Sequence, residues 1–252
     1  MGQVIAVANQ KGGVGKTTTA VNLAAGLAVA GKEVLLIDFD PQANASSSLN
    51  ARSESAPPQN HYLVAPGSDN RCQPTATPRL SILAGSPALQ AVGRILAAAP
   101  DKDFRLKRAL AAYRDRFDYI LIDCPPSMSL FTSNALVAAD KVLVPLQCEY
   151  FAMEGLAQMV AVVKSVKKGP NAILEICGIV LTMFDAVIDV NRDVVDEVRR
   201  HFGAQVFDTV IVRDPALTEA ASHAQTIFQY APASRAAFAY ATLTREVLSG
   251  TR

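Results

Sequence analysis

The glycine-rich segment NQKGGVGKTTT contains two lysines, Lys11 and Lys16, five residues apart. Its second half matches the phosphate-binding pattern G-x-x-x-x-G-K-[ST], with Gly15, Lys16 and Thr17 in the last three positions. Gln10 stands where that pattern begins with a glycine, and Lys11 is a lysine that the pattern does not require. The segment therefore predicts a polyphosphate site with one lysine more than a single site needs.

The chemistry of such a loop comes from its backbone and from two side chains. Glycines let the N–H groups approach a polyphosphate closely, and the start of a helix adds a favourable dipole. We expect Lys16 to contact the β- and γ-phosphates and the Thr17 hydroxyl to bind Mg²⁺. A glycine-rich turn with an incidental lysine is the alternative, and the flanking strand and helix patterns argue against it. The predicted ATP-binding run is Lys11, Gly12, Gly13, Val14, Gly15, Lys16, Thr17 and Thr18.

Acidic residues follow two apolar runs that have the pattern of strands. Asp38 and Asp40 end the run EVLLIDFD, and Asp123 ends DYILID. A carboxylate at the end of a buried strand suits Mg²⁺ binding through water, and a second one can orient a water molecule. We therefore expect Asp123 to bind the metal through water, with Asp38 as a further metal candidate. Any one of these acids alone can instead cap the turn that follows it.

Segments of strand and helix pattern alternate along almost the whole chain. Several strand segments are apolar throughout, as strands covered on both faces are, so the sequence predicts an α/β fold with a doubly wound, mostly parallel sheet. We expect one domain over residues 1–252, with an irregular surface excursion at about 51–79, which is rich in Pro, Ser and Asn. The predicted strands are 4–9, 33–40, 80–85, 118–125, 141–147, 176–184 and 206–212. The predicted helices are 16–30, 101–114, 129–138, 151–167, 190–201 and 233–248.

The composition excludes several classes of function. Half of the residues are hydrophobic and the mean hydropathy is +0.19, so the chain can bury a large core. The net charge of +1 gives no overall field for nucleic acid or an anionic membrane, so such contacts need a local patch. The four cysteines include no C-x-x-C pair, and no apolar run is long enough to span a bilayer. We expect a cytoplasmic protein.

The run KGGVGKTT resembles the deviant Walker A box of the ParA/MinD superfamily of P-loop ATPases. The resemblance to the partition (Soj-type) branch covers nearly the whole chain. It includes DFDPQANAS, DYILIDCPPS, NALVAADKVLVPLQCEYFAMEGL, LTMFD and IFQYAPASRAAFAY. Agreement over so many separate segments is far more specific than any one motif. The resemblance implies an ATPase that segregates DNA or positions a protein cargo.

The resemblance implies a role for each matching residue. Lys11 corresponds to the signature lysine, which reaches the partner's phosphates across an ATP-bound sandwich dimer. Lys16 and Thr17 match the Walker A lysine and the Mg²⁺ ligand. Asp40 matches the residue associated with the attacking water, and Asp123 matches the Walker B acid. The implied catalytic set is therefore Lys11, Lys16 and Asp40, acting on ATP and Mg²⁺. In relatives the turn IVRDP lies beside the adenine, so Val212, Arg213 and Asp214 are candidate base contacts.

The implied partners are a second copy of the chain, a ParB-like activator or cargo adaptor, and non-specific DNA. Binding to DNA would add association with the nucleoid. Two positions where the partition branch commonly has arginine are apolar here, Val187 and Ala216, so DNA-binding residues are not carried over. Two basic segments can replace them, 102–116 and KSVKK at 164–168, although both patterns are also typical of solvated helix faces.

Two other classes share the phosphate loop. A MinD-like membrane switch needs a terminal amphipathic helix, and the end FAYATLTREVLSGTR has only Arg245 and Arg252 as basic residues. Membrane binding is therefore not expected. A metabolic iron protein on the same fold needs paired cysteines at a dimer interface, and Cys124 and Cys148 show no such pattern. A binding module without hydrolysis is a further alternative.

Overall fold

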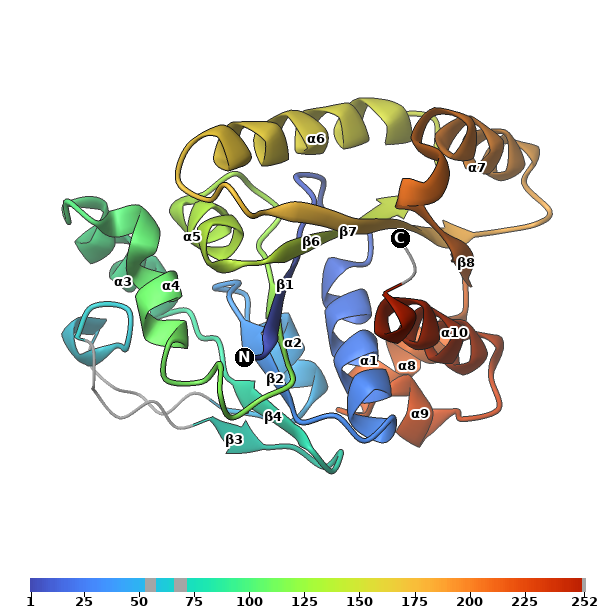
Figure 1. Ribbon diagram of the computed structural model, residues 1–252. Helices are drawn as coiled ribbons and strands as arrows, with labels where there is room; N and C mark the ends of the chain where they lie inside the picture. Colours follow the sequence, from blue (N-terminus) through green and yellow to red (C-terminus); the bar gives the residue numbers. More distant parts are fainter. Residues whose placement is uncertain (53–57, 66–71, 251–252) are drawn as a thin grey trace.

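The structure is a computed structural model that describes residues 1–52, 58–65 and 72–250, and its centre is an eight-stranded sheet (Figure 1). The strand order is β3-β4-β2-β5-β1-β6-β7-β8, and all pairs are parallel except β3 with β4. The predicted α/β class with a mostly parallel sheet is confirmed. The strands are β1 Gln3–Val7, β2 Val34–Asp38, β3 Gln73–Pro74, β4 Leu80–Leu83, β5 Tyr119–Asp123, β6 Lys141–Gln147, β7 Glu175–Phe184 and β8 Val206–Val212.

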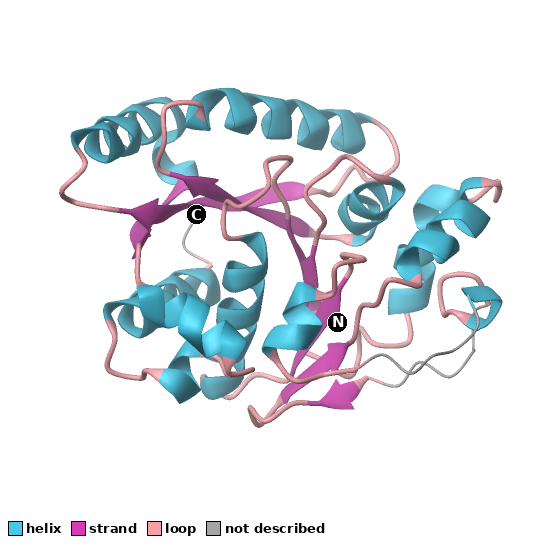
Figure 2. Ribbon diagram, turned by 180° about the vertical axis from the view of Figure 1, so that it is seen from behind, coloured by secondary structure: helices cyan, strands magenta, loops and turns pink. Residues whose placement is uncertain are grey.

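Helices cover both faces of this sheet, as Figures 1 and 2 show from opposite sides. Alternate residues of β1 enter two separate apolar cores, Val4 and Ala6 on one face and Ile5 and Val7 on the other. The first core lies under α3 to α7, and the second lies under α1, α2 and α8 to α10. Burial on both faces explains why these strands are apolar throughout. The helices are α1 Lys16–Val29, α2 Asn44–Ser48, α3 Leu89–Ala97, α4 Arg105–Leu110, α5 Leu130–Ala138, α6 Ala152–Lys168, α7 Asp189–Phe202, α8 Pro215–Ser222, α9 Ile227–Tyr230 and α10 Arg235–Ser249.

The helix predicted over 101–114 is wrong in its length. The chain forms a 3₁₀ turn at Lys102–Phe104 and then only the six residues of α4. After Leu110 the chain continues in turns, and the carbonyl of Arg114 accepts a hydrogen bond of 2.6 Å from Gly2 N, which ties this segment to the start of β1. Four further helices, α2, α3, α8 and α9, lie in segments where no helix was predicted.

The segment 51–79 contributes to the core as well as to the surface. Leu63 is 1% exposed and belongs to the core on the α3 to α7 side, against which Tyr62 and Val64 also pack. The short strand β3 adds an antiparallel edge beside β4. Residues 53–57 and 66–71 of the predicted excursion lie outside the described residues.

The carboxyl ends of β1, β5 and β2 meet at one edge of the sheet. The register places Val7 beside Asp123, and Asp123 beside Asp38. Ligands of open α/β sheets bind at this edge, outside the carboxyl ends of the strands. After α1 the chain turns back through Gly31, whose φ of +87° is the left-handed conformation that favours glycine at the end of a helix. The fold therefore brings the phosphate loop and the two strand-end acids to one place.

Candidate functional site

The phosphate loop connects β1 to α1 in a conformation that depends on glycine. Gly13 and Gly15 have φ values of +76° and +85°, and Gly15 is the N-cap of α1. No side chain caps this helix, so its first N–H groups face the loop. A cavity of about 260 Å³ lies against them. Its lining residues are Gly12, Gly13, Gly15, Lys16, Thr17, Thr18, Asp40, Asn44, Pro126 and Met183.

Lys16 lies inside this site. Its side chain is buried, and its Nζ donates a hydrogen bond of 2.7 Å to the carbonyl oxygen of Lys11. Burial lowers the pKa of Lys16, and the nearby carboxylates of Asp123 and Asp40 act in the opposite direction. The loop thus folds back on its own lysine and holds the ammonium group among acids.

Lys11 lies at the rim, in a different environment. Its side chain is 43% exposed and forms an ion pair with Glu149, whose side chain is 35% exposed. Its backbone is fixed, because Lys11 N donates to Asn9 Oδ1 at 3.1 Å and Asn9 Nδ2 donates to the carbonyl of Pro145 at 2.7 Å. The loop position of Lys11 is therefore set from the interior while its ammonium group stays at the surface.

Asp123 has the character of an unsatisfied metal-site residue. It is fully buried, and neither carboxylate oxygen has a hydrogen-bond partner among the described residues. Burial raises the pKa of Asp123 well above its usual range, and the neighbouring Asp38 raises it further. The Thr17 side chain favours the ionised form, although no hydrogen bond of ordinary geometry joins the two. Two buried oxygens without donors beside a threonine hydroxyl fit a hydrated Mg²⁺ ion, which keeps several of its waters.

Asp38 and Asp40 are both buried but are engaged differently. Asp38 accepts hydrogen bonds from Ser46 and from Asp40 N, and burial raises the pKa of Asp38 while the Ser46 bonds lower it. Asp40 lines the phosphate cavity, and its Oδ1 accepts from Gln42 N at 2.9 Å. The oxygens of Asp38 thus already have protein donors. A metal-binding role for Asp38 stays a prediction.

A second cavity of about 320 Å³ adjoins the first and contains the three predicted base contacts. Val212, Arg213 and Asp214 line it, and Gly15, Thr18 and Met183 line both cavities. Asp214 also accepts hydrogen bonds from Ala216 N at 3.0 Å and Ala236 N at 3.3 Å, so it caps α8. The two adjoining cavities match the two ends of a nucleotide. The cavity at the loop suits the phosphates, and the cavity beside the end of β8 suits the base. Contact with a base stays a prediction.

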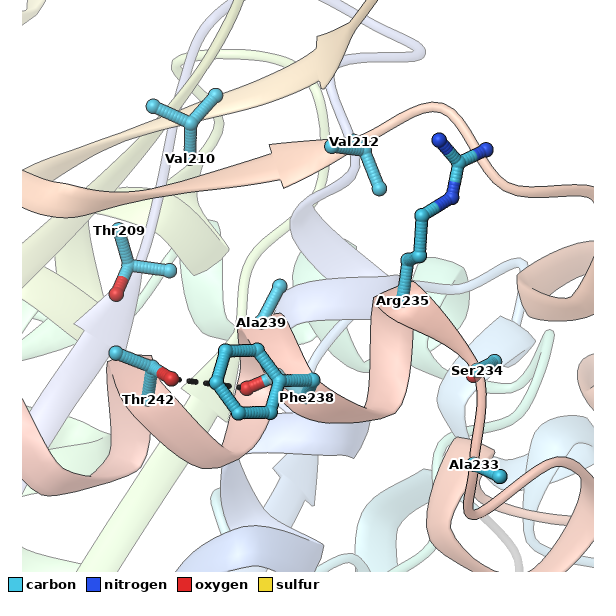
Figure 3. Close-up of a pocket in the computed structure, with 9 residues that line it drawn as sticks. All are labelled: Thr209, Val210, Val212, Ala233, Ser234, Arg235, Phe238, Ala239 and Thr242. Carbon is cyan, nitrogen blue, oxygen red and sulfur yellow. Dashed lines mark hydrogen bonds between the residues drawn. The ribbon is translucent and has the colours of Figure 1, made fainter.

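A larger cavity, about 530 Å³, lies away from the phosphate loop. It lies between the edge strand β8 and α10, and Figure 3 shows Arg235 at one end and Phe238 on the helix side. It shares only Val212 with the base cavity and no residue with the phosphate cavity. Cavity size therefore does not identify the predicted phosphate site. The phosphate site is found by its chemistry.

The two positions where arginine is absent differ in exposure. Val187 is 89% exposed in the turn before α7, whereas Ala216 in α8 packs partly against the core. The basic segment 102–116 is largely used within the fold. Arg105 and Arg108 pair with Asp101, Arg114 pairs with Asp140, and Arg116 lies over the rings of Tyr113 and Phe117.

Three observations concern the residues named for the alternative classes. No group of three or more His, Cys, Asp or Glu is placed to hold a metal ion within 1–52, 58–65 and 72–250. Cys124 and Cys148 are buried, and burial raises the pKa of the Cys148 thiol to about 12, so it stays protonated. Across the same ranges, the helices are all too short or too polar to cross a membrane.

Four residues at the site were not predicted. Glu149 follows β6 at the same edge of the sheet as the other acids, so the rule that selected Asp123 also applies to Glu149. Thr182 donates a hydrogen bond of 2.9 Å to the carbonyl of Val14 and supports the loop from β7. Asn44 and Met183 line the phosphate cavity, and no local sequence signal identifies them, because their place depends on how distant segments pack.

Comparisons with known proteins agree with this geometry. A sequence family described as "AAA domain" matches residues 2–176. The chain is 45% identical to the chromosome-partitioning ATPase Soj of Thermus thermophilus over 246 residues, 97% of this chain and 95% of that protein. It is 42% identical to the chromosome partitioning protein ParA of Myxococcus xanthus over 252 residues, 98% and 88% of the two chains. The cobyrinic acid a,c-diamide synthase of Mycobacterium smegmatis, solved with an ATP analogue and magnesium, superposes with a TM-score of 0.85 at 32% identity, covering 98% of this chain and 94% of that one.

Proposed function

The chain belongs to the Soj/ParA branch of the ParA/MinD superfamily of P-loop ATPases, and we propose that it segregates DNA or positions a protein cargo through ATP-dependent dimerisation. The observation that carries this proposal is the contrast between Lys16, buried in its own loop, and Lys11, exposed at the rim on a surface ion pair. We further propose that residues 1–252 act as one domain.

On this proposal the nucleotide site binds ATP together with Mg²⁺, and the superposed synthase was solved with an ATP analogue and magnesium. We assign the phosphates to the N–H groups of the loop and to Lys16, and the base to the cavity beside Val212, Arg213 and Asp214. Thr17 directly, and Asp123 through water, would hold the metal, which when bound neutralises charge on the transferred phosphoryl group. The unpartnered oxygens of Asp123 support this assignment.

Asp40 is assigned to the attacking water. It lines the phosphate cavity and is 8% exposed, and Gln42 N fixes one of its oxygens at 2.9 Å. A carboxylate held in this way can accept a hydrogen bond from water and orient it toward the γ-phosphate. The buried loop position limits the directions that the carboxylate can take.

Lys11 is assigned to the phosphates of a partner copy. A surface ion pair of two partly exposed side chains contributes about 0–1 kcal/mol, so exchanging Glu149 for a phosphate costs little. A cation supplied by a partner contributes about 10³–10⁵ in rate where such groups have been measured. Turnover thereby depends on dimerisation, and we propose that it is slow until a ParB-like activator or a cargo adaptor binds the dimer.

The cargo is the open part of the proposal. Val187 and Ala216 remove two arginines that the partition branch commonly uses for DNA, and the basic segment 102–116 is largely paired internally. We therefore propose DNA segregation with a DNA surface different from the usual one, or positioning of a protein cargo. The cycle takes place in the cytoplasm on this proposal, on the nucleoid if DNA is bound.

Analytical ultracentrifugation with ATP, ADP and no nucleotide tests the proposal. We expect dimers only with ATP in the wild type, persistent dimers in Asp40→Ala because hydrolysis is blocked, and monomers in Lys16→Ala. Phosphate release measured on the same samples should be present only in the wild type. Identical sedimentation with and without ATP in both the wild type and Asp40→Ala would overturn the proposal.

A further inference from the structure

Asp38 binds two separate parts of the chain with one carboxylate. It is the last residue of β2 and is 2% exposed. Its Oδ2 accepts hydrogen bonds from Ser46 N at 2.7 Å and from the Ser46 hydroxyl at 2.6 Å. Its Oδ1 accepts from Asp40 N at 3.3 Å. The carboxylate thus joins the end of a strand to the short helix α2, eight residues further along.

The Ser46 hydroxyl also joins a third segment. It accepts a hydrogen bond of 2.8 Å from Gly85 N, just after β4, while it donates to Asp38. A Cβ at position 85 would lie 2.8 Å from Asp38 Cγ, so only glycine allows this approach. One buried hydroxyl therefore connects the ends of β2 and β4 with α2.

The segment enclosed by these bonds carries Asp40. Residues 39–45 lie between Asp38 and Ser46. Because Asp40 N and Ser46 N both donate to the Asp38 carboxylate, the segment is fixed near both of its ends. Inside it, Ala43 N donates to the carbonyl of Asp40 at 2.9 Å, and Ala43 has a positive φ of 55°. The ring of Phe39 packs edge-on against Phe131 at 5.2 Å. The conformation of the segment is set by these attachments.

The helix α2 cannot set this conformation by itself. It has five residues, no side chain caps it, and so short a helix is not stable without tertiary contacts. Asn44 at its start lines the phosphate cavity together with Asp40. Where α2 lies therefore decides where both side chains stand relative to the phosphates.

We infer that Ser46 is a positioning residue for ATP hydrolysis, which anchors α2 to Asp38 and Gly85 and so holds the Asp40 carboxylate at the phosphate site. This inference rests on the proposed function of Asp40. It assigns Asp38 the role of an anchor within the protein, and it leaves ATP binding to the phosphate loop on the other side of β5. Loss of the Ser46 hydroxyl should therefore affect turnover and spare affinity.

The test compares Ser46→Ala with Ser47→Ala, because Ser47 lies on the same short helix and its hydroxyl bonds only to Ala43 O, at 3.0 Å, on an exposed face. We expect Ser46→Ala to lower kcat by about 10- to 100-fold, since small misplacement of a reacting group has effects of this size. The KM for ATP and the ATP-dependent dimer should stay within about twofold of the wild type, a tolerance much smaller than that kcat effect. Ser47→Ala should match the wild type, and Ser46→Thr, which keeps the hydroxyl, should recover most of the lost kcat.

Three results would overturn the inference. The first is a kcat of Ser46→Ala equal to that of Ser47→Ala, and the second is a raised KM with unchanged kcat. If Ser46→Ala does not fold, Asp38→Asn replaces it, because this variant keeps the size of the Asp38 side chain and removes its charge. The third result is full ATPase activity in Asp38→Asn. A wild type that hydrolyses no more ATP than Asp40→Ala would instead overturn the proposed function itself. Thermal melts of every variant show which samples are folded.

Discussion

Two groups of loops at the same edge of the sheet differ in almost every respect. The first group comprises the loops after β1, β2 and β5 together with the residues that flank them, and these include the buried polar side chains of Lys16, Asp38 and Asp123. The loops after β7 and β8 carry the exposed residues Val187 and Arg213. The first group is bonded to itself and to the strands, whereas the Val187 side chain is 89% exposed and its N–H donates a bond of 3.0 Å to Asp185 in the same turn.

On the proposed function, the first group of loops forms the ATP site, and the second group is where a surface for DNA or a protein cargo would lie. In the first group, each polar residue depends on the burial of its neighbours, so a change at one position affects the pKa or the hydrogen bonds of the others. An exposed side chain such as Val187 changes without such cost. The sequence resemblance predicts agreement with the partition branch in the first group and a departure from it at Val187 in the second.

The largest effect should come from Lys16→Ala. Removing one donor that stabilises developing charge lowers kcat by about 10²–10³. Losing a charged hydrogen bond to bound ATP also lowers the affinity for ATP by about tenfold. We expect kcat/KM for ATP to fall about 10³- to 10⁴-fold on the same grounds. Steady-state phosphate release measures this. The control is Lys32→Ala, beyond the end of α1, which should keep a kcat/KM near that of the wild type. A similar fall in kcat/KM for Lys32→Ala would contradict a specific role for Lys16.

Lys11→Ala should give the next largest effect, about 10³-fold in turnover at saturating ATP, the lower end of what a cation from a partner contributes. ATP affinity should change little, because Lys16 and the loop backbone remain. The matched control is Glu149→Gln, which removes the ion pair and keeps the lysine. Sedimentation with ATP should show monomers for Lys11→Ala and dimers for Glu149→Gln. Dimers in both variants would contradict a role for Lys11 across the interface.

The first group of loops is also where the sequence was most informative. Glycines, Lys-Thr and acids after apolar strands have local physical reasons, so the positions of Lys16, Asp40 and Asp123 at one edge followed from a parallel sheet. The strand ranges 141–147 and 206–212 agree with the structure at both ends. The apolar run of β6 is specified by burial on both faces, which the sequence records directly.

Tertiary contacts decided what the sequence could not show. The helix expected at 101–114 stops at Leu110, and the segment after it is joined to the start of β1 by a bond from Gly2, about a hundred residues away in the chain. The five-residue helix α2 exists because Asp38 and Gly85 hold Ser46. Glu149 was missed although it follows a strand as the other acids do, because its partner Lys11 was expected to face a second chain.

Thr182 tests whether the two groups of loops are independent. It lies on β7, and its hydroxyl donates to the carbonyl of Val14 in the phosphate loop at 2.9 Å. Thr182→Val keeps the shape and leaves that buried carbonyl without its donor, so we expect unfolding to become easier by about 1–2 kcal/mol and ATP affinity to fall about threefold. Chemical denaturation and nucleotide titration measure both. Thr242→Val, whose exposed hydroxyl bonds only within its own helix, should change neither.

The smallest expected effect concerns the second group of loops. Val187→Arg restores a charge on a side chain that is 89% exposed, where the partition branch commonly has arginine. One new phosphate contact should make the slope of log K against log salt steeper by about 0.9, which corresponds to a gain of about three- to fourfold between 200 and 50 mM salt. Fluorescence anisotropy with a non-specific DNA duplex and ATP measures it. Val187→Gln, a neutral polar replacement, should keep the wild-type slope. Equal slopes for the two variants would show that this turn does not face DNA, and the contrast between the two groups of loops would then concern a protein cargo.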